Sequence, residues 1–148
     1  MQVVQKAEAP TVIYFEDLRE GMSAEYRRTV TQRDVELFAQ GSGDNNPLHL
    51  DESYAKGTMF KGRIAHGMLT ASYISTVIGT QMPGPGCIYL GQSFRFKAPV
   101  RAGDEVVAKV TVTELQPAKC RATFRTTCSV GERVVLDGEA LIQVPSRA

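Results

Sequence analysis

The sequence lacks the features that would place it in several large classes of protein. Lys and Arg total 17 and Asp and Glu total 16 among 148 residues, so there is no basic surplus. Proteins that bind nucleic acid usually carry such a surplus, and we expect no nucleic-acid partner. No run approaches the roughly 18 apolar residues of a membrane-spanning helix. The first ten residues also lack the apolar segment of an export signal, so we expect a cytoplasmic protein without a membrane partner.

Cysteine and histidine are scarce as well. The three cysteines are odd in number and lack the CxxC spacing of a zinc site; they are Cys87, Cys120 and Cys128. Only two histidines accompany them, at distant positions. We therefore expect reduced cysteines that pack as small apolar residues, and neither a metal nor another cofactor.

The length fits one domain over residues 1–148, with residues 1–10 as a flexible extension. A chain of this size buries roughly 68 to 70% of its unfolded surface around a single core. A short strand is predicted over Ala24–Val30. A helix is predicted over Gln32–Gln40, because Thr31 resembles an N-cap with Asp34 three residues later.

A second helix is predicted from His66 to Gly79. Its apolar residues are spread around the whole helical circumference, which indicates a helix inside the protein. The Pro- and Gly-rich segment Met82–Gly86 ends this helix.

Long strands are predicted in the remainder of the chain. They are separated by short breaks typical of antiparallel neighbours, and they cover Cys87–Ala98, Asp104–Leu115, Lys119–Val130 and Arg133–Val144. Helices followed by consecutive strands indicate an α+β domain, with one curved antiparallel sheet wrapped around the long central helix. Because such a sheet has edge strands that a partner subunit can protect, we expect a homodimer or a higher homo-oligomer.

The run Gly43-Asp44-Asn45-Asn46-Pro47-Leu48-His49 carries the main chemical signal. Its Asp and His are five residues apart, a spacing that would separate their side chains on a helix or on a strand. The Gly, Asn and Pro residues between and before them favour a folded-back loop, which could aim both groups at one point. A carboxylate and a neutral imidazole sharing a water are suited to acid-base chemistry. An ordinary turn with an incidental histidine would fit the same residues.

The sequence resembles the R-specific enoyl-CoA hydratases, also called MaoC-like hydratases or hydratase 2, over roughly residues 30–144. Four segments that occur in the family's order carry the likeness: 38–49 together with Ala55, 64–69, 89–96 and 99–104. The resemblance implies a hot-dog fold and the reversible syn addition of water to a trans-2-enoyl-CoA, which gives an (R)-3-hydroxyacyl-CoA. It also implies that Asp44 and His49 are catalytic, that the Gly67 N–H binds the thioester oxygen, and that Ser75 lies near the site.

Several of these residues have alternative interpretations. Gly67 begins the predicted central helix, where free N–H groups and the positive end of the helix dipole favour an oxyanion. It could equally serve only for tight entry into that helix. Asn46 would hold the loop or the Asp44 carboxylate. Ile78 could line an acyl tunnel or belong to the core, and His66 is expected to pack structurally.

The sequence does not decide which residues bind the coenzyme A phosphates or which reaction the protein catalyses. Four cations lie near the motifs and could face the phosphates or only solvent: Lys61, Arg63, Arg95 and Lys97. A hot-dog thioesterase, a dehydratase acting on acyl carrier protein thioesters and a non-catalytic acyl-thioester binding subunit are the alternatives to a hydratase. Acyl length and pathway are open, since polyester precursor supply, fatty-acid breakdown and lipid synthesis all use this reaction.

Overall fold

The computed structural model describes residues 12–148, and the extension predicted for residues 1–10 lies outside this range. The helical segments are η1 (Phe15–Asp17), α1 (Gln32–Ser42), α2 (Pro47–Leu50), α3 (Glu52–Lys56), α4 (Gly67–Thr80) and η2 (Pro117–Lys119). The strands are β1 (Ser23–Thr29), β2 (Ile88–Gln92), β3 (Arg95–Phe96), β4 (Glu105–Gln116), β5 (Arg121–Val130) and β6 (Arg133–Gln143). Among the described residues, none of these helices is both long and apolar enough to cross a bilayer.

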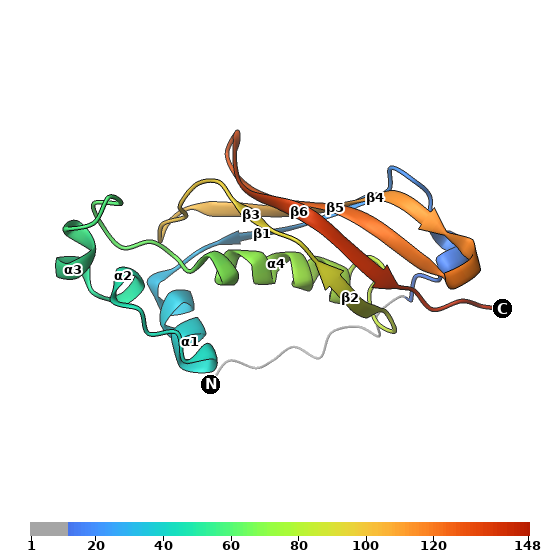
Figure 1. The fold of residues 1–148 in the computed structure, drawn as a ribbon, viewed down its shortest axis with the longest axis horizontal. Helices are drawn as coiled ribbons and strands as arrows, with labels where there is room; N and C mark the ends of the chain where they lie inside the picture. Colours follow the sequence, from blue (N-terminus) through green and yellow to red (C-terminus); the bar gives the residue numbers. More distant parts are fainter. Residues whose placement is uncertain (1–11) are drawn as a thin grey trace.

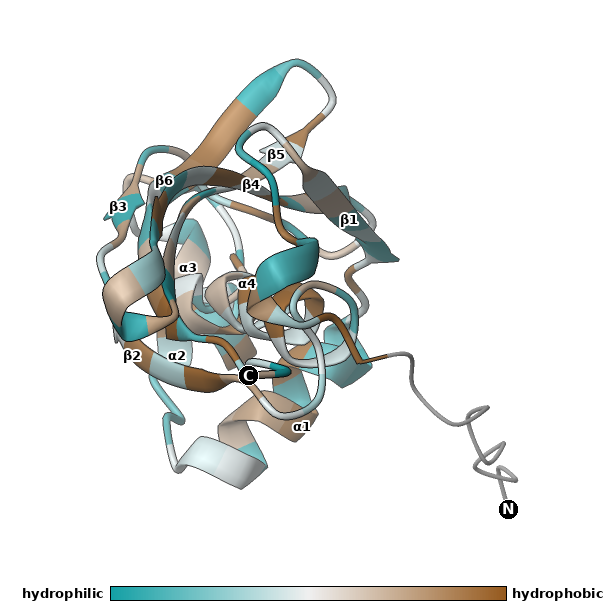
Figure 2. Ribbon diagram, turned by 90° about the vertical axis from the view of Figure 1, so that its right-hand side faces the viewer, coloured by the Kyte–Doolittle hydropathy of each residue, from teal (hydrophilic) through white to brown (hydrophobic). Residues whose placement is uncertain are grey.

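One antiparallel sheet covers the central helix. Its strands follow the order β1-β4-β5-β6-β2, and the short β3 pairs with β6. The sheet arches over α4, while α1, α2 and α3 lie at one end of the molecule, beyond the start of α4 (Figure 1). The view along the helix shows α4 on the concave side of the curved sheet (Figure 2). The predicted α+β architecture is therefore confirmed.

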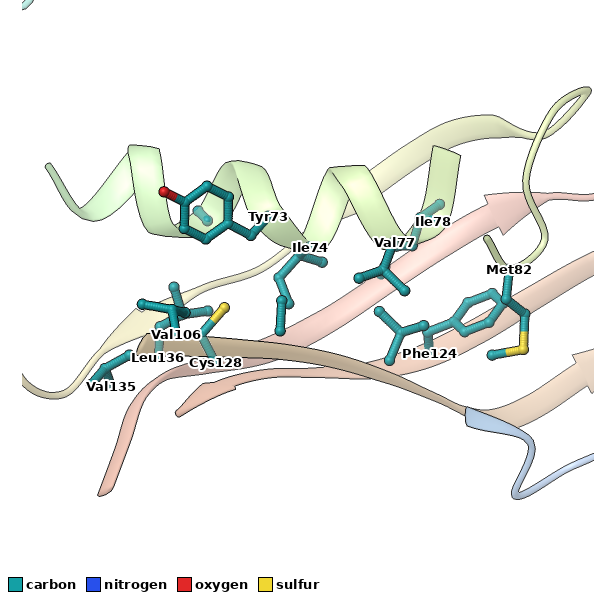
Figure 3. Packing of buried hydrophobic residues seen from close by; sticks show 14 of the residues in the cluster. Tyr73, Ile74, Val77, Ile78, Met82, Val106, Phe124, Cys128, Val135 and Leu136 are labelled. Carbon is teal, nitrogen blue, oxygen red and sulfur yellow. The ribbon is translucent and has the colours of Figure 1, made fainter. Parts of the chain in front are cut away.

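The core lies between α4 and the concave face of the sheet. Ile74, Val77 and Ile78 of α4 are fully buried, and they point toward strand residues that include Val106 and Phe124 (Figure 3). The strands supply their half of the core by alternation, since every second residue of β4 from 106 to 112 is buried. Another face of α4 stays exposed, since Met68 is 56% exposed and Ser75 and Gly79 are exposed as well. The expectation of a helix inside the protein is therefore met only on the face of α4 that packs against the sheet.

The two predicted helices begin almost where the sequence places them. The Thr31 hydroxyl accepts a hydrogen bond from the Asp34 N–H at 3.1 Å, and the Asp34 carboxylate accepts one from the Thr31 N–H at 3.1 Å. This reciprocal capping box confirms the predicted start of α1. The helix ends two residues later than predicted, at Ser42, because Gly43 takes up a left-handed conformation with φ of 80°.

The prediction of one continuous strand over Cys87–Ala98 is wrong. The segment divides into β2 and β3 around Ser93 and Phe94, where the chain crosses very close to Gly138 of β6. A side chain at position 138 would lie within 1.7 Å of the Ser93 carbonyl oxygen, so only glycine permits this crossing. The break turns the chain so that β3 reaches the N-terminal end of α4.

Candidate functional site

A cavity of about 520 Å³ opens beside the N-terminal end of α4. Its wall is mainly apolar, and includes Met59, Phe60, Met68, Phe96 and Leu136. Four ionisable side chains also line it: Asp44, His49, His66 and Lys97. An apolar cleft that contains a few convergent polar groups has the general character of a ligand site.

The segment after α1 brings Asp44 and His49 to this cavity. Gly43 ends α1, and the Asn46 side chain then accepts a hydrogen bond from the Leu48 N–H at 3.1 Å. With Pro47 at its first position, this cap starts the single-turn helix α2, which carries His49. The prediction of a loop throughout is therefore corrected: the Asp lies in a loop and the His lies on a helical turn. The Asn46 side chain thus shapes the loop, and its main-chain N–H contacts the Asp44 carboxylate.

His49 is held by a hydrogen bond at the back of its ring. Its Nδ1 lies 2.8 Å from the Ile64 carbonyl oxygen. A carbonyl can only accept, so Nδ1 carries the proton and Nε2 of the neutral ring is left as a free acceptor. Burial lowers the pKa of His49, and the neighbouring His66 lowers it further, while the Ile64 hydrogen bond and the Asp44 carboxylate act in the opposite direction. The ring is therefore suited to accept a proton or a hydrogen bond at neutral pH.

Asp44 occupies the more exposed side of the cavity. Its carboxylate accepts a hydrogen bond from the Asn46 N–H at 3.3 Å, and its own N–H donates to the Ser42 hydroxyl at 3.1 Å. One oxygen of Asp44 and one ring nitrogen each of His49 and His66 lie within 4.8 Å of one another. The structure thus brings together the two residues that the sequence pairs, and it adds His66 to them.

The same three side chains are the ones that could contribute ligands to a metal ion. Each ring has only one nitrogen left, because His49 Nδ1 and His66 Nε2 are bonded to backbone carbonyls. The two rings are stacked, with centroids 3.9 Å apart and planes tilted by 32°. That the protein needs neither a metal nor a cofactor stays a prediction.

Gly67 is the first residue of α4, and it lines the cavity. The N–H groups of a first helical turn have no partner within the helix, so this end of α4 presents donors and a positive dipole. A Cβ at position 67 would lie 2.7 Å from the nearest carbon of the Phe96 ring. Glycine is therefore required for the close approach of Phe96 to the start of α4.

Phe96 is a cavity residue that the sequence did not reveal. It lies on β3, and its ring covers the Gly67 backbone. The local sequence offers no signal for this contact, because it joins positions that are far apart in the chain. Only the division between β2 and β3 places the ring there.

Two other predicted site residues do not line the cavity. Ser75 lies on α4 more than two turns beyond Gly67, and its side chain is exposed. Ile78 lies one turn further on, and it is fully buried in the core. The helix carries both residues away from Asp44 and His49, so a supporting role for either one stays a prediction.

Of the four predicted cations, Lys97 is the one that lines the cavity. Its ammonium is paired with the Asp137 carboxylate at 2.9 Å. Arg63 is paired with Glu52 at 3.1 Å. Both side chains remain partly exposed.

The chain is similar to several known proteins. A family model described as "MaoC like domain" matches residues 16–134. The chain is 58% identical to an (R)-specific enoyl-CoA hydratase of Rhodospirillum rubrum, over 90% of this chain and 93% of that protein. It is 52% identical to a 3-hydroxybutyryl-CoA dehydratase of Methylorubrum extorquens, over 92% and 87% respectively.

A solved structure extends the likeness to three dimensions. The unliganded R-hydratase PhaJ1 from Pseudomonas aeruginosa has a TM-score of 0.86 and 46% identity, over 92% of this chain and 88% of that one. The hot-dog fold implied by the sequence is confirmed.

The environment of His49 predicts a titration below the ordinary histidine pKa of 6.5. The unfolded chain binds this proton near pH 6.5, whereas the folded chain binds it only at lower pH. The neutral His49 ring therefore contributes its full share to the free energy of unfolding above pH 6.5. This contribution declines as the pH falls from 6.5 toward the pKa of the folded state. An NMR titration of the ring protons measures the midpoint, and His49→Gln assigns the signal because only two histidines are present. A midpoint at or above 6.5 would contradict the prediction.

Proposed function

The chain belongs to the MaoC-like domain family, and we propose that it is a hydro-lyase that adds water reversibly to a trans-2-enoyl-CoA, giving the (R)-3-hydroxyacyl-CoA. The observation that carries the proposal is the convergence of the Asp44 carboxylate and the His49 imidazole on one apolar cavity beside the start of α4. Relatives named as enoyl-CoA hydratase and 3-hydroxybutyryl-CoA dehydratase support it, because the two names describe opposite directions of one equilibrium. The R configuration rests on the relatives.

Hydration of an enoyl thioester makes three chemical demands. The oxygen of water must attack C3, a proton must reach C2, and the negative charge that develops on the thioester oxygen must be stabilised. A water held between an Asp44 oxygen and a His49 nitrogen fits their separation of at most 4.8 Å, because two hydrogen bonds of about 2.8 Å can span it. Two of the three demands can therefore be met at one position.

Within this proposal, Asp44 is the general base and His49 orients the water. The His49 Nε2 accepts a hydrogen bond from one water hydrogen, which is consistent with the neutral tautomer set by Ile64. The Asp44 carboxylate removes the other hydrogen as a proton while the water oxygen bonds to C3. The protonated Asp44 then gives this proton to C2 on the same face, which makes the addition syn and returns the carboxylate to its starting state.

Gly67 meets the third demand, which is to stabilise the negative charge on the thioester oxygen. As the double bond accepts the oxygen, electrons move onto the thioester oxygen, and an N–H at the N-terminus of α4 can donate to it. The absence of a side chain leaves room for a thioester to approach the Gly67 N–H beside the Phe96 ring. Base, water and oxyanion donor would then surround the same three-carbon unit.

The carrier and the reaction type follow from the same features. Both relatives named above act on coenzyme A thioesters, which favours coenzyme A over acyl carrier protein for this chain. Lys97, which lines the cavity and is half exposed, supplies positive charge for an anionic carrier. Among residues 12–148, none that lines the cavity is a Ser or Cys that could act as a nucleophile in thioester hydrolysis. A thioesterase that uses a general base is the alternative that the assay must distinguish.

The protein is proposed to act as a homodimer. β2 is an edge strand of the sheet, and it exposes Ile88 by 58% and Leu90 by 43%. The other edge strand, β1, carries charged residues such as Glu25 and Arg27, which disfavour pairing with another strand. An apolar, unpaired edge is suited to antiparallel pairing with a second copy.

Crotonyl-CoA tests the reaction directly. The purified protein should abolish the absorbance of the conjugated enoyl group without releasing free thiol. Asp44→Asn and His49→Gln should each lower kcat about 10²- to 10⁴-fold, the usual range for losing positioned acid-base catalysis.

A neighbouring carboxylate provides the matched control for these variants. The Asp51 carboxylate caps α3 by accepting a hydrogen bond from the Tyr54 N–H at 3.1 Å, and Asp51 does not line the cavity. Asparagine caps a helix equally well. Asp51→Asn should therefore keep the parent rate. Thiol release would assign a thioesterase instead, and parental rates in both site variants would remove Asp44 and His49 from the mechanism.

Gly67→Ala tests the oxyanion position. The new methyl group would meet the Phe96 ring at 2.7 Å and occupy the approach of the thioester. We expect kcat/KM to fall on the order of tenfold or more, as on weakening an oxyanion-hole donor. Gly79→Ala on the same helix is the control, since a Cβ there meets nothing within 4 Å. Equal activity in the two variants would contradict the role of Gly67.

Light scattering of the eluting protein tests the assembly. The mass should be twice the 16.2 kDa of one chain. The double variant Ile88→Lys and Leu90→Lys should shift the mass toward one chain, because it places charge on the apolar edge. Arg27→Glu on the opposite edge should leave the dimer intact. A parent mass of a single chain would exclude the homodimer.

A further inference from the structure

His66 stands at the junction between the cavity and the central helix. It directly precedes Gly67, and it is the N-cap residue of α4. Its carbonyl accepts hydrogen bonds from the Leu69 N–H at 3.1 Å and the Thr70 N–H at 3.3 Å. Its side chain makes no capping hydrogen bond, although the residue is only 2% exposed. The main chain alone therefore starts the helix, and the buried ring is available for another task.

The ring makes one hydrogen bond, and it leads to Asp44. His66 Nε2 lies 2.9 Å from the Asp44 carbonyl oxygen, so Nε2 carries the proton. The other nitrogen, Nδ1, is buried and has no hydrogen-bond partner among the described residues. This pattern corresponds to the neutral tautomer in which Nε2 is the donor.

Two other aromatic rings are in contact with the His66 ring. His49 stacks against it with centroids 3.9 Å apart, and Phe38 of α1 packs against it at 4.8 Å with a tilt of 53°. His66 is therefore in contact with both members of the proposed water-binding pair, with the main chain of Asp44 and with the ring of His49. It also belongs to the helix that presents Gly67.

Asp44 needs such a support. It lies in the exposed segment between α1 and α2, and the hydrogen bond to its carboxylate comes from Asn46 of the same segment. A local bond shapes the segment, but it does not fix the segment relative to the rest of the protein. The bond from His66 joins the segment to α4, which is anchored in the core.

We propose that His66 is a positioning residue for the hydration reaction: its Nε2–H holds the Asp44 main chain, and its ring supports the His49 imidazole, so that the base keeps its place relative to Gly67. This inference rests on the proposed function. It revises the purely structural interpretation that the sequence favours for His66. His66 touches neither the water nor the substrate in this scheme, and its effect is exerted through its two neighbours.

Replacement of His66 by Gln or by Asn, whose amide groups differ in reach, separates the effect of the Nε2 hydrogen bond from the effect of losing the ring. The side-chain nitrogen of Gln overlays the Nε2 position of histidine, whereas that of Asn reaches only the Nδ1 position. Both variants lose the stacked ring, and both introduce a polar amide into the same buried space. His66→Gln should therefore retain more activity than His66→Asn if the bond to Asp44 matters.

We expect His66→Asn to lower kcat about 10- to 100-fold with KM changed less than about threefold, because misplacement of a catalytic group by about 1 Å has costs of this size. His66→Gln should recover about tenfold of that loss. His66→Phe keeps an aromatic ring but removes the N–H, and its kcat should resemble that of His66→Asn. Steady-state kinetics with crotonyl-CoA provides kcat and KM separately, and thermal unfolding of each variant provides Tm.

Val77→Ala is the control for a general loss of stability. Val77 is fully buried on the same helix and lies outside the cavity wall, so this variant should lower Tm while keeping kcat near the parent value.

Equal kcat in the Gln and Asn variants, or a parental kcat in His66→Phe, would overturn the proposal. If the parent protein itself fails to hydrate crotonyl-CoA, the proposed function fails, and that result is distinct from failure of the His66 inference. Should His66→Phe not fold, the comparison of Gln with Asn still decides.

Discussion

Two hydrogen bonds from buried imidazole rings to main-chain carbonyls hold this site together. One joins His49 to the Ile64 carbonyl, and the other joins His66 to the Asp44 carbonyl. They run in opposite directions between the segment after α1 and the segment that leads into α4. Each carbonyl oxygen accepts a hydrogen bond from the ring nitrogen that carries the proton. The two bonds therefore set the position of each ring and also its tautomer. Each neutral ring keeps one nitrogen free, and that of His49 is suited to water.

The arched sheet makes this arrangement possible by burying α4. The sheet covers the face of α4 that carries Ile74, Val77 and Ile78, while another face, which includes Met68, stays exposed. The N-terminal end of α4 is the part where a cavity remains, so the free N–H groups of its first turn meet an apolar space rather than bulk water. Charges and dipoles act more strongly in such a space than in water. The same burial that stabilises the fold therefore prepares an electrostatic site at the end of the helix.

Local features of the sequence were predictable because they depend on neighbouring residues. The capping box of Thr31 and Asp34, the buried character of α4 and the alternation in β4 each involve contacts or periodicities within a few positions. Features that depend on distant contacts were not predictable in this way. The division of the segment Cys87–Ala98 follows from its crossing with Gly138, and the place of Phe96 over Gly67 follows from that division. The helical turn α2 was also missed, because four residues are too few for a periodic signal.

The sequence by itself determined the two main helices and most of the long strands, and it determined which acid and imidazole are paired in one short segment. Backbone preferences of Gly, Asn and Pro act over single residues, and hydrophobic periodicity acts over one element, so both can be recognised in the printed chain. Only the tertiary structure decided how far those groups stand apart, which nitrogen of each ring is free, and that His66 joins the pair. Those properties arise where α1, α2, β3 and α4 meet, and hydrogen bonds across that junction depend on atomic positions that no single segment defines.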